Sequence, residues 1–179
     1  MNKNVLIIST SLRVGRNSET LAEAFAVGAK EANHQVEVVS LVNKKINFCI
    51  GCLSCQSTKE CVIKDDSNEI VAKMKKADVI VFATPVYYYE MCGQMKTLLD
   101  RSNPLFSTDY SFRDIYLIAT AADADDSAMV GVTAGLQGWI DCYEKTSLKG
   151  VIKGLDADAY DDIKKHPAYR EAYEMGKNV

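Results

Sequence analysis

Short apolar runs alternate along this 179-residue chain with longer stretches in which apolar residues recur every three or four positions. The first pattern predicts buried strands, and the second predicts helices with one face in a core. We expect strands at residues 5–8, 36–41, 78–84, 114–120 and 148–152. We expect helices at the stretch carrying Leu21, Ala24, Phe25 and Gly28, and at residues 67–76, 93–101, 127–143 and 161–175.

Strands and helices that alternate in this way form a parallel sheet with helices on both faces. Five strands suit a doubly wound α/β architecture, and without a repeat or linker we expect one domain over residues 1–179. Pro85 is expected to end the third strand, because proline lacks a backbone donor, and Gly176 to cap the last helix. A cysteine-rich insertion at about residues 43–65 interrupts the alternation.

Composition and charge point to a small-molecule partner. Hydrophobic residues make up 47% of the chain, and a net charge of −3 leaves no basic surface for nucleic acid or an anionic membrane. The N-terminal apolar run is shorter than the core of a signal peptide, so we expect a cytoplasmic protein. In that reducing compartment the six cysteines are expected as thiols or metal ligands rather than structural disulfides.

The segment STSLRVGRNSET, residues 9–20, lies between the first strand and the first helix. In an open α/β sheet this loop presents free backbone N–H groups and a helix dipole to an anion. Arg13 and Arg16 add guanidinium groups for charge-assisted bonds to a phosphate. The alternative is a polar loop in which Asn17 or Ser18 caps the helix. The hydroxyl and amide groups available here belong to Ser9, Thr10, Ser11, Asn17, Ser18 and Thr20.

Two further loops leave the same edge of the predicted sheet. TPVYYYE, residues 84–90, follows the third strand, and its aromatic rings with polar tips suit the edge of a flavin ring. Ordinary surface packing of the tyrosines is the alternative. The loop at residues 119–128 carries Asp123, Asp125 and Asp126, which read as helix-start carboxylates or, with less support, as ligands of a divalent ion.

Four cysteines in thirteen residues, Cys49, Cys52, Cys55 and Cys61, form the densest chemical feature of the chain. The compact spacing favours the four corners of a cubane iron–sulfur cluster. Zinc sites with four thiolates usually combine two separated pairs, so zinc is a weaker alternative beside thiol or disulfide redox chemistry and no role at all. Gly51 lowers the steric cost of wrapping the chain tightly.

The remaining cysteines and the histidines carry no assignment. Cys92 and Cys142 stand alone, and a single cysteine is more often a small buried hydrophobe than a nucleophile. His34 and His166 belong to no acid–nucleophile pattern, so the sequence does not support a hydrolase triad.

Three stretches together resemble the flavodoxin-like, NAD(P)H-dependent FMN reductases. The first loop is similar to the family pattern GSPRxxGNS at Ser11, Arg13, Asn17 and Ser18, with Thr10 in place of its usual glycine. The run ATPVYYYEMCGQMKTLLDRS is similar to TPVYxxxxxxQxKxxxDR. The cysteine spacing, followed by CVIKDD, resembles the iron–sulfur flavoproteins, a branch of the same group.

The resemblance implies a flavodoxin-like three-layer sandwich with a five-stranded parallel sheet in the order 2-1-3-4-5 and FMN at its carboxyl edge. It implies a phosphate site at the first loop and helix packing or subunit contact for the residues matched in 93–101, namely Gln94, Lys96, Asp100 and Arg101. The ring contacts that it implies are Thr84, Pro85, Val86, Tyr87 and Tyr88.

The resemblance further implies an oxidoreductase in which FMN takes electrons from NAD(P)H or a reduced protein donor and passes them to a small-molecule or protein acceptor. A 4Fe-4S cluster on the four cysteines would relay electrons from a ferredoxin-like partner, and the chain would form a homodimer or homotetramer. The alternatives are a flavin or quinone reductase without a metal cluster, and a non-enzymatic redox carrier or thiol sensor.

Overall fold

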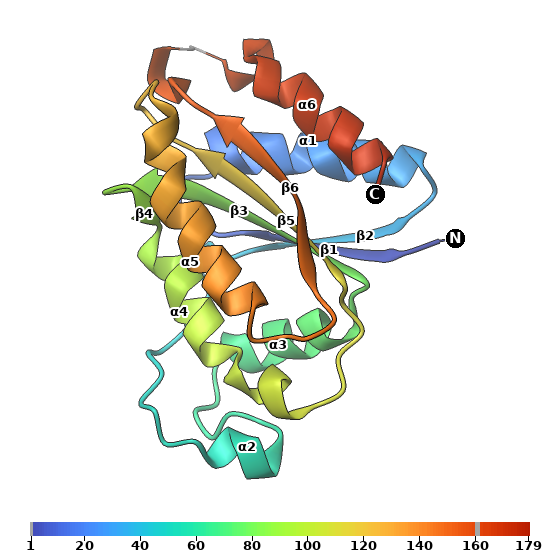
Figure 1. The fold of residues 1–179 in the computed structure, drawn as a ribbon, viewed down its shortest axis with the longest axis vertical. Helices are drawn as coiled ribbons and strands as arrows, with labels where there is room; N and C mark the ends of the chain where they lie inside the picture. Colours follow the sequence, from blue (N-terminus) through green and yellow to red (C-terminus); the bar gives the residue numbers. More distant parts are fainter. Residues whose placement is uncertain (1, 160–161) are drawn as a thin grey trace.

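A computed structural model describes residues 2–159 and 162–179 and shows a central sheet between two layers of helices (Figure 1). Five parallel strands follow the order β2-β1-β3-β5-β6, which confirms the predicted order 2-1-3-4-5. A sixth strand, β4, is a two-residue addition that pairs antiparallel with β3. The strands are β1 Asn4–Ser9, β2 Gln35–Ser40, β3 Val79–Tyr87, β4 Glu90–Met91, β5 Asp114–Thr120 and β6 Ser147–Gly154.

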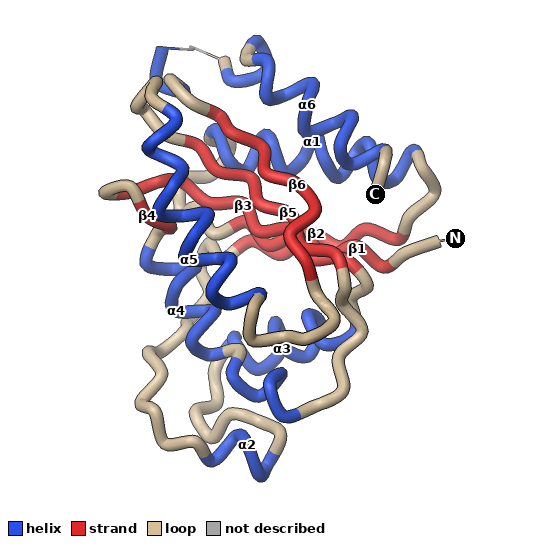
Figure 2. Tube along the Cα trace, viewed as in Figure 1, coloured by secondary structure: helices blue, strands red, loops and turns tan. Residues whose placement is uncertain are grey.

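The helices cover both faces because the central strands are apolar on both. In β1, Val5 and Ile7 pack into one core, while Leu6 and Ile8 pack into the other. Helices α1 and α6 lie over the first face, and α3, α4 and α5 lie over the second (Figures 1 and 2). The helices are α1 Asn17–Glu31, α2 Ser54–Thr58, α3 Asp66–Lys76, α4 Gly93–Arg101, α5 Val130–Ile140 and α6 Pro167–Lys177.

Short 3-10 segments complete the described elements and change two predicted helices. The helix predicted from residue 127 begins as the 3-10 turn Asp126–Met129 before α5. The start of the last predicted helix, residue 161, lies outside the described residues, and α6 itself begins at Pro167, whose fixed φ suits a first helical position. The other 3-10 segments are Asn103–Ser107, Ala157–Ala159 and Ile163–Lys165.

Gly176 does not cap the last helix as predicted, because it lies inside α6 and faces α1. A Cβ on Gly176 would lie 2.1 Å from the carbonyl oxygen of Phe25, and one on Gly28 would lie 2.0 Å from that of Tyr173. The two glycines therefore allow α1 and α6 to cross at backbone contact.

The prediction that Pro85 ends the third strand was wrong, since β3 continues through it to Tyr87. The carbonyl of Ala83 accepts a hydrogen bond from the N–H of Thr10, so Pro85, two residues on, faces the same side of the strand. On that side β1 has already ended at Ser9. No neighbouring strand requires the donor that Pro85 lacks.

The cysteine segment lies at the end of the molecule opposite α6 and is loop except for α2 (Figure 2). It leaves the sheet after β2 and returns at α3, as the predicted insertion does. None of the described helices is long and apolar enough to cross a lipid bilayer.

Candidate cofactor sites

A cavity of about 180 Å³ lies at the carboxyl edge of the sheet, where the predicted loops meet. The first loop contributes Ser11, Arg13, Arg16, Asn17 and Ser18 to its lining. The end of β3 contributes Pro85, Val86 and Tyr87, and the loops after β5 and β6 contribute Thr120, Ala121, Ala122, Ala157 and Asp158. The topology thus brings the predicted phosphate and ring loops together. The contribution after β6 was missed, although β6 is the neighbour of β5 in the sheet.

The first loop leaves the amino end of α1 open to a ligand. Arg16 is the N-cap and makes no side-chain cap bond, so Asn17 and Ser18 do not cap the helix as the alternative interpretation held. The Asn17 side chain instead donates to the carbonyl of Ala157 (3.4 Å). Ser11 Oγ accepts from the Arg13 N–H (3.1 Å), which folds the loop back over the helix end. Free N–H groups and two guanidiniums at one helix end suit a phosphate.

Behind the cavity, a buried network joins the first loop to the third-strand loop. Thr10 Oγ1 donates to the Ala83 carbonyl (2.9 Å) and lies 3.2 Å from the thiol of Cys92. The Cys92 N–H donates to Thr84 Oγ1 (3.2 Å). Thr84 and Ser9, both predicted cofactor contacts, are fully buried and do not line the cavity; Ser9 Oγ has no hydrogen-bond partner among the described residues.

The three tyrosines differ in their position at the cavity. Tyr87 lines it, whereas Tyr88 is fully exposed at the tip of the β3–β4 hairpin. Tyr88 and Tyr89 both adopt left-handed backbone, with φ of 50° and 64°. Residues with side chains rarely adopt that conformation, so the surrounding structure must hold it. The structure therefore brings Pro85, Val86 and Tyr87 to the cavity and leaves Tyr88 outside.

Helix α5 and the acidic loop hold the hairpin in place. A Cβ on Gly131 would lie 2.2 Å from the Tyr89 carbonyl oxygen, so only glycine allows this approach of backbone to helix. The Tyr89 hydroxyl donates to Asp123 Oδ2 (3.1 Å), and this hydrogen bond raises the pKa of Tyr89. The hairpin is thus fixed from its helix side and from its tip.

The other acidic residues of that loop behave largely as the helix-start interpretation expects. Asp125 accepts from the Ser127 N–H (2.8 Å) at the start of the 3-10 turn, and the hydrogen bonds from Ser127 lower the pKa of Asp125. Asp126 forms an ion pair with Lys153 (2.8 Å). Asp125 and Asp126 therefore already have partners within the fold.

All four clustered cysteines line a second, smaller cavity of about 30 Å³ between the insertion and the end of α4. Left-handed backbone at Gly51 and Leu53, with φ of 65° and 57°, turns the chain tightly around it. Among the residues the structure describes, no three His, Cys, Asp or Glu side chains gather around a point that could hold a single metal ion.

Donors surround these sulfurs. The side-chain amide of Asn103 donates to Cys55 Sγ (3.0 Å), and the N–H of Gly51 donates to Cys49 Sγ (3.5 Å). Hydrogen bonds from the backbone and side chain of Ser54 lower the pKa of the Cys52 thiol, which favours its thiolate.

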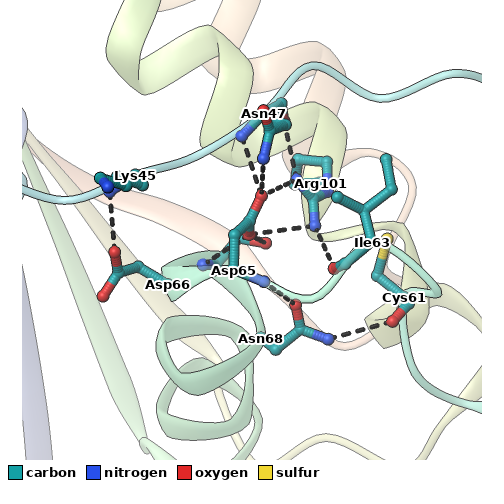
Figure 3. A network of polar contacts seen from close by, with 9 residues as sticks. Lys45, Asn47, Cys61, Ile63, Asp65, Asp66, Asn68 and Arg101 are labelled. Carbon is teal, nitrogen blue, oxygen red and sulfur yellow. Dashed lines mark hydrogen bonds and ion pairs between the residues drawn. The ribbon is translucent and has the colours of Figure 1, made fainter.

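Arg101 anchors the insertion to the rest of the domain (Figure 3). Its side chain is fully buried at the last turn of α4 and forms a two-pronged ion pair with Asp65, at 2.7 and 3.1 Å. It also donates to the carbonyls of Asn47 (2.7 Å) and Ile63 (2.8 Å). Burial alone would raise the pKa of Asp65, but hydrogen bonds from Arg101, Asn47 and Ser67 hold it well below its usual range.

The donor sets of the two cavities suit the two predicted groups. Guanidiniums and an open helix end match a phosphate. A cubane cluster takes one thiolate per iron, so its four sulfurs need not surround a single point. The Nε of Arg101, which borders the cysteine cavity, is buried without a hydrogen-bond partner among the described residues. A buried unsatisfied donor costs about 1–3 kcal/mol, which an acceptor bound in the cavity would offset.

The fold and these two sites define a flavodoxin-like domain with a cysteine-rich insertion. Residues 3–142 match the family of NADPH-dependent FMN reductases, and the chain belongs to that family of oxidoreductases.

Similarity to curated proteins supports the iron–sulfur flavoprotein branch. The chain is 41% identical over 101 residues to an iron–sulfur flavoprotein of Methanocaldococcus jannaschii, covering 56% of this chain and 52% of that protein. It is 35% identical over 102 residues to an iron–sulfur flavoprotein of Archaeoglobus fulgidus, covering 57% of this chain and 46% of that protein. The chain thus spans about half the length of these curated relatives.

Among solved structures, the fold is similar to an NAD(P)H:quinone oxidoreductase from Methanothermobacter marburgensis. The TM-score is 0.80 at 18% identity, over 99% of this chain and 96% of that one. This likeness supports the flavodoxin-like fold across the whole chain.

Proposed function

We propose that this protein is an FMN-binding oxidoreductase that passes electrons from NAD(P)H or a reduced protein donor to a small-molecule or protein acceptor. The observation that carries the proposal is the cavity at the carboxyl edge, which joins the first loop to the end of β3. Family membership supports FMN as its ligand. When bound, FMN supplies the hydride and electron chemistry that protein side chains lack.

The residues around the cavity would bind and orient this cofactor. Arg13, with Ser11, Asn17, Ser18 and the free N–H groups of α1, would hold the phosphate. Pro85, Val86 and Tyr87 would lie against the flavin ring, with Thr84 behind them and Tyr88 at the solvent side. Ser9, buried beneath the loop with a free hydroxyl, would support the phosphate end.

We further propose that Cys49, Cys52, Cys55 and Cys61 hold a 4Fe-4S cluster. Support comes from their shared cavity, from the donors around their sulfurs and from the iron–sulfur flavoprotein relatives. Helix α4 begins beside Cys92 at the cofactor network and ends at Arg101 beside the cysteines. Nine residues of helix span about 13 Å, so both sites would share one rigid element through which they could act as donor and relay.

The assembly and the partners also belong to this proposal. A ferredoxin-like protein would supply single electrons at the cluster, and NAD(P)H would act as co-substrate at the flavin. We expect a homodimer or homotetramer, as the family resemblance implies. The exposed aromatic side chains of Tyr87, Tyr88 and Tyr89 beside the cavity are consistent with a surface that a second subunit covers.

Anaerobic purification followed by an absorption spectrum, with iron and acid-labile sulfide assayed on the same sample, tests the proposal. Flavin bands, about four irons per chain and NAD(P)H oxidation by the loaded protein would support it in full. Flavin bands without iron would leave a flavin or quinone reductase whose cysteines act as thiols. Flavin without NAD(P)H oxidation would favour the redox carrier or sensor, and absence of flavin would sink the central claim.

A further inference from the structure

The guanidinium of Arg101 uses four of its donors to hold the cysteine insertion. Nη1 donates to Asp65 Oδ2 and to the Asn47 carbonyl, each at 2.7 Å. Nη2 donates to Asp65 Oδ1 at 3.1 Å and to the Ile63 carbonyl at 2.8 Å. A guanidinium carries five N–H donors. The fifth, on Nε, is buried and has no partner within the described residues.

The open Nε–H faces the cysteine side of Arg101. In a planar guanidinium Nε–H lies along the same edge as Nη2, whose lateral bond goes to Ile63. Arg101 borders both the cysteine cavity and a neighbouring cavity that contains Lys59 and Lys64, but Ile63 lines only the first of these two. Figure 3 shows Ile63 and Cys61 together on the side of Arg101 away from Asn47.

We propose that Arg101 is a positioning and tuning residue of the cysteine site, whose Nε–H donates a hydrogen bond to a sulfur of the bound cluster. This inference rests on the proposed function, because it assumes that the four cysteines bind iron and sulfide. It assigns Arg101 two tasks. Four donors fix the insertion around the cavity, and the fifth sets the reduction potential of what the cavity holds.

The expected effect on the potential follows from charge. Reduction by one electron adds negative charge to the cluster and its thiolates, and hydrogen bonds to the sulfurs favour the more negative state. A buried cationic donor such as Arg101 does so strongly, because little solvent screens it. Arg101 therefore raises the midpoint potential and makes the cluster easier to reduce.

Redox titration of anaerobic holoprotein, monitored by electron paramagnetic resonance, compares wild type with Arg101→Lys and Arg101→Gln. Both variants lose the Nε donor, and Arg101→Gln also loses the positive charge. We expect a lower midpoint potential in both and the larger shift in Arg101→Gln. Lys96→Gln, which removes an exposed cation from the same helix, is the matched control and should not shift it.

Isotope labelling tests the hydrogen bond without a mutation. Arg101 is the arginine that lines the cysteine cavity, so protein grown with ¹⁵N-arginine should show nitrogen coupled to the reduced cluster in pulsed resonance spectra. This measurement decides the matter if the Arg101 variants fail to fold.

The outcomes separate this inference from the function beneath it. Unchanged potentials in both variants at full iron content, or absence of ¹⁵N coupling in wild type, would overturn the role of Arg101 and leave the cluster in place. A wild-type protein without iron would overturn the cluster and this role together.

Discussion

Thr10 and Cys92 lie 82 residues apart in the sequence, yet the hydroxyl of one is 3.2 Å from the thiol of the other. Thr10 belongs to the loop after β1, and Cys92 precedes α4 immediately after the β3–β4 hairpin. Their contact therefore ties the proposed phosphate loop to the proposed ring loop. Both side chains are buried, so solvent does not compete for this interaction.

Replacing Cys92 with alanine is predicted to loosen both loops. The variant loses a buried polar contact, which should lower the free energy of unfolding by about 1–2 kcal/mol and weaken FMN binding. Urea unfolding and fluorescence titration with FMN measure the two effects. Cys142→Ala removes an exposed thiol and is the control. Equal FMN affinity in all three proteins would show that the contact has no part in the flavin site.

Replacing Arg13 with glutamine is predicted to weaken FMN binding roughly tenfold to a hundredfold, because a charge-assisted hydrogen bond contributes about 1.5–3 kcal/mol. Riboflavin lacks the phosphate, so its affinity should change little. Titration of both flavins therefore separates the loss of a phosphate contact from general damage. Arg170→Gln, at an exposed position on α6, is the charge control. A parallel loss of riboflavin affinity would place Arg13 outside the phosphate site.

Replacing Gly131 with alanine is predicted to displace the hairpin that carries Tyr87. The added Cβ would meet the Tyr89 backbone, which should cost about 1–3 kcal/mol of folding stability and reduce FMN affinity. Gly138→Ala is the matched control on the same helix, since its Cβ meets nothing within 4 Å. That variant should be neutral or more stable by up to about 1 kcal/mol. Similar behaviour of the two variants would contradict the close approach.

Replacing Asp65 with asparagine is predicted to destabilise the protein by about 3 kcal/mol at pH 7, because Arg101 would keep its charge without its buried partner. The effect depends on pH. The folded-state pKa of Asp65 is depressed, so its contribution is complete above the ordinary carboxylate pKa, about 4, and is lost as the pH falls through the folded value. The stability difference between wild type and variant should therefore narrow on acidification.

Denaturant unfolding of wild type and Asp65→Asn between pH 7 and pH 3 checks this dependence. Asp109→Asn, at an exposed site, is the control and should follow wild type throughout. A difference that widens on acidification would show that the ion pair is not what stabilises the insertion.

Local sequence signals predicted much of this fold. The bounds of β5 and α4 match the predicted residues 114–120 and 93–101. Tertiary contacts decided the exceptions. Gly176 has the features of a cap, but it remains helical because its missing side chain admits the backbone of Phe25. Pro85 stays in its strand because β1 has ended beside it.

The sites show the same division. Motif spacing brought the phosphate and ring loops to one cavity, since the carboxyl ends of parallel strands share an edge. The role of Arg101 could not be predicted, because its partners Asn47, Ile63 and Asp65 lie 36 to 54 residues away. A motif match identified Arg101 but not the segment that folds around it.

The base of the cysteine insertion is closed on itself. The N–H of Lys45 donates to Asp66 Oδ2 (2.7 Å), and the N–H of Asp66 donates back to the Lys45 carbonyl (3.1 Å). Entry and exit therefore lie side by side, as in compact surface loops that accept deletion or exchange. The thiol centre is thus a removable cassette. It could be excised at its neck, with Arg101 replaced by an apolar residue, or transplanted to another flavodoxin-like scaffold that offers a buried arginine at the same helix end.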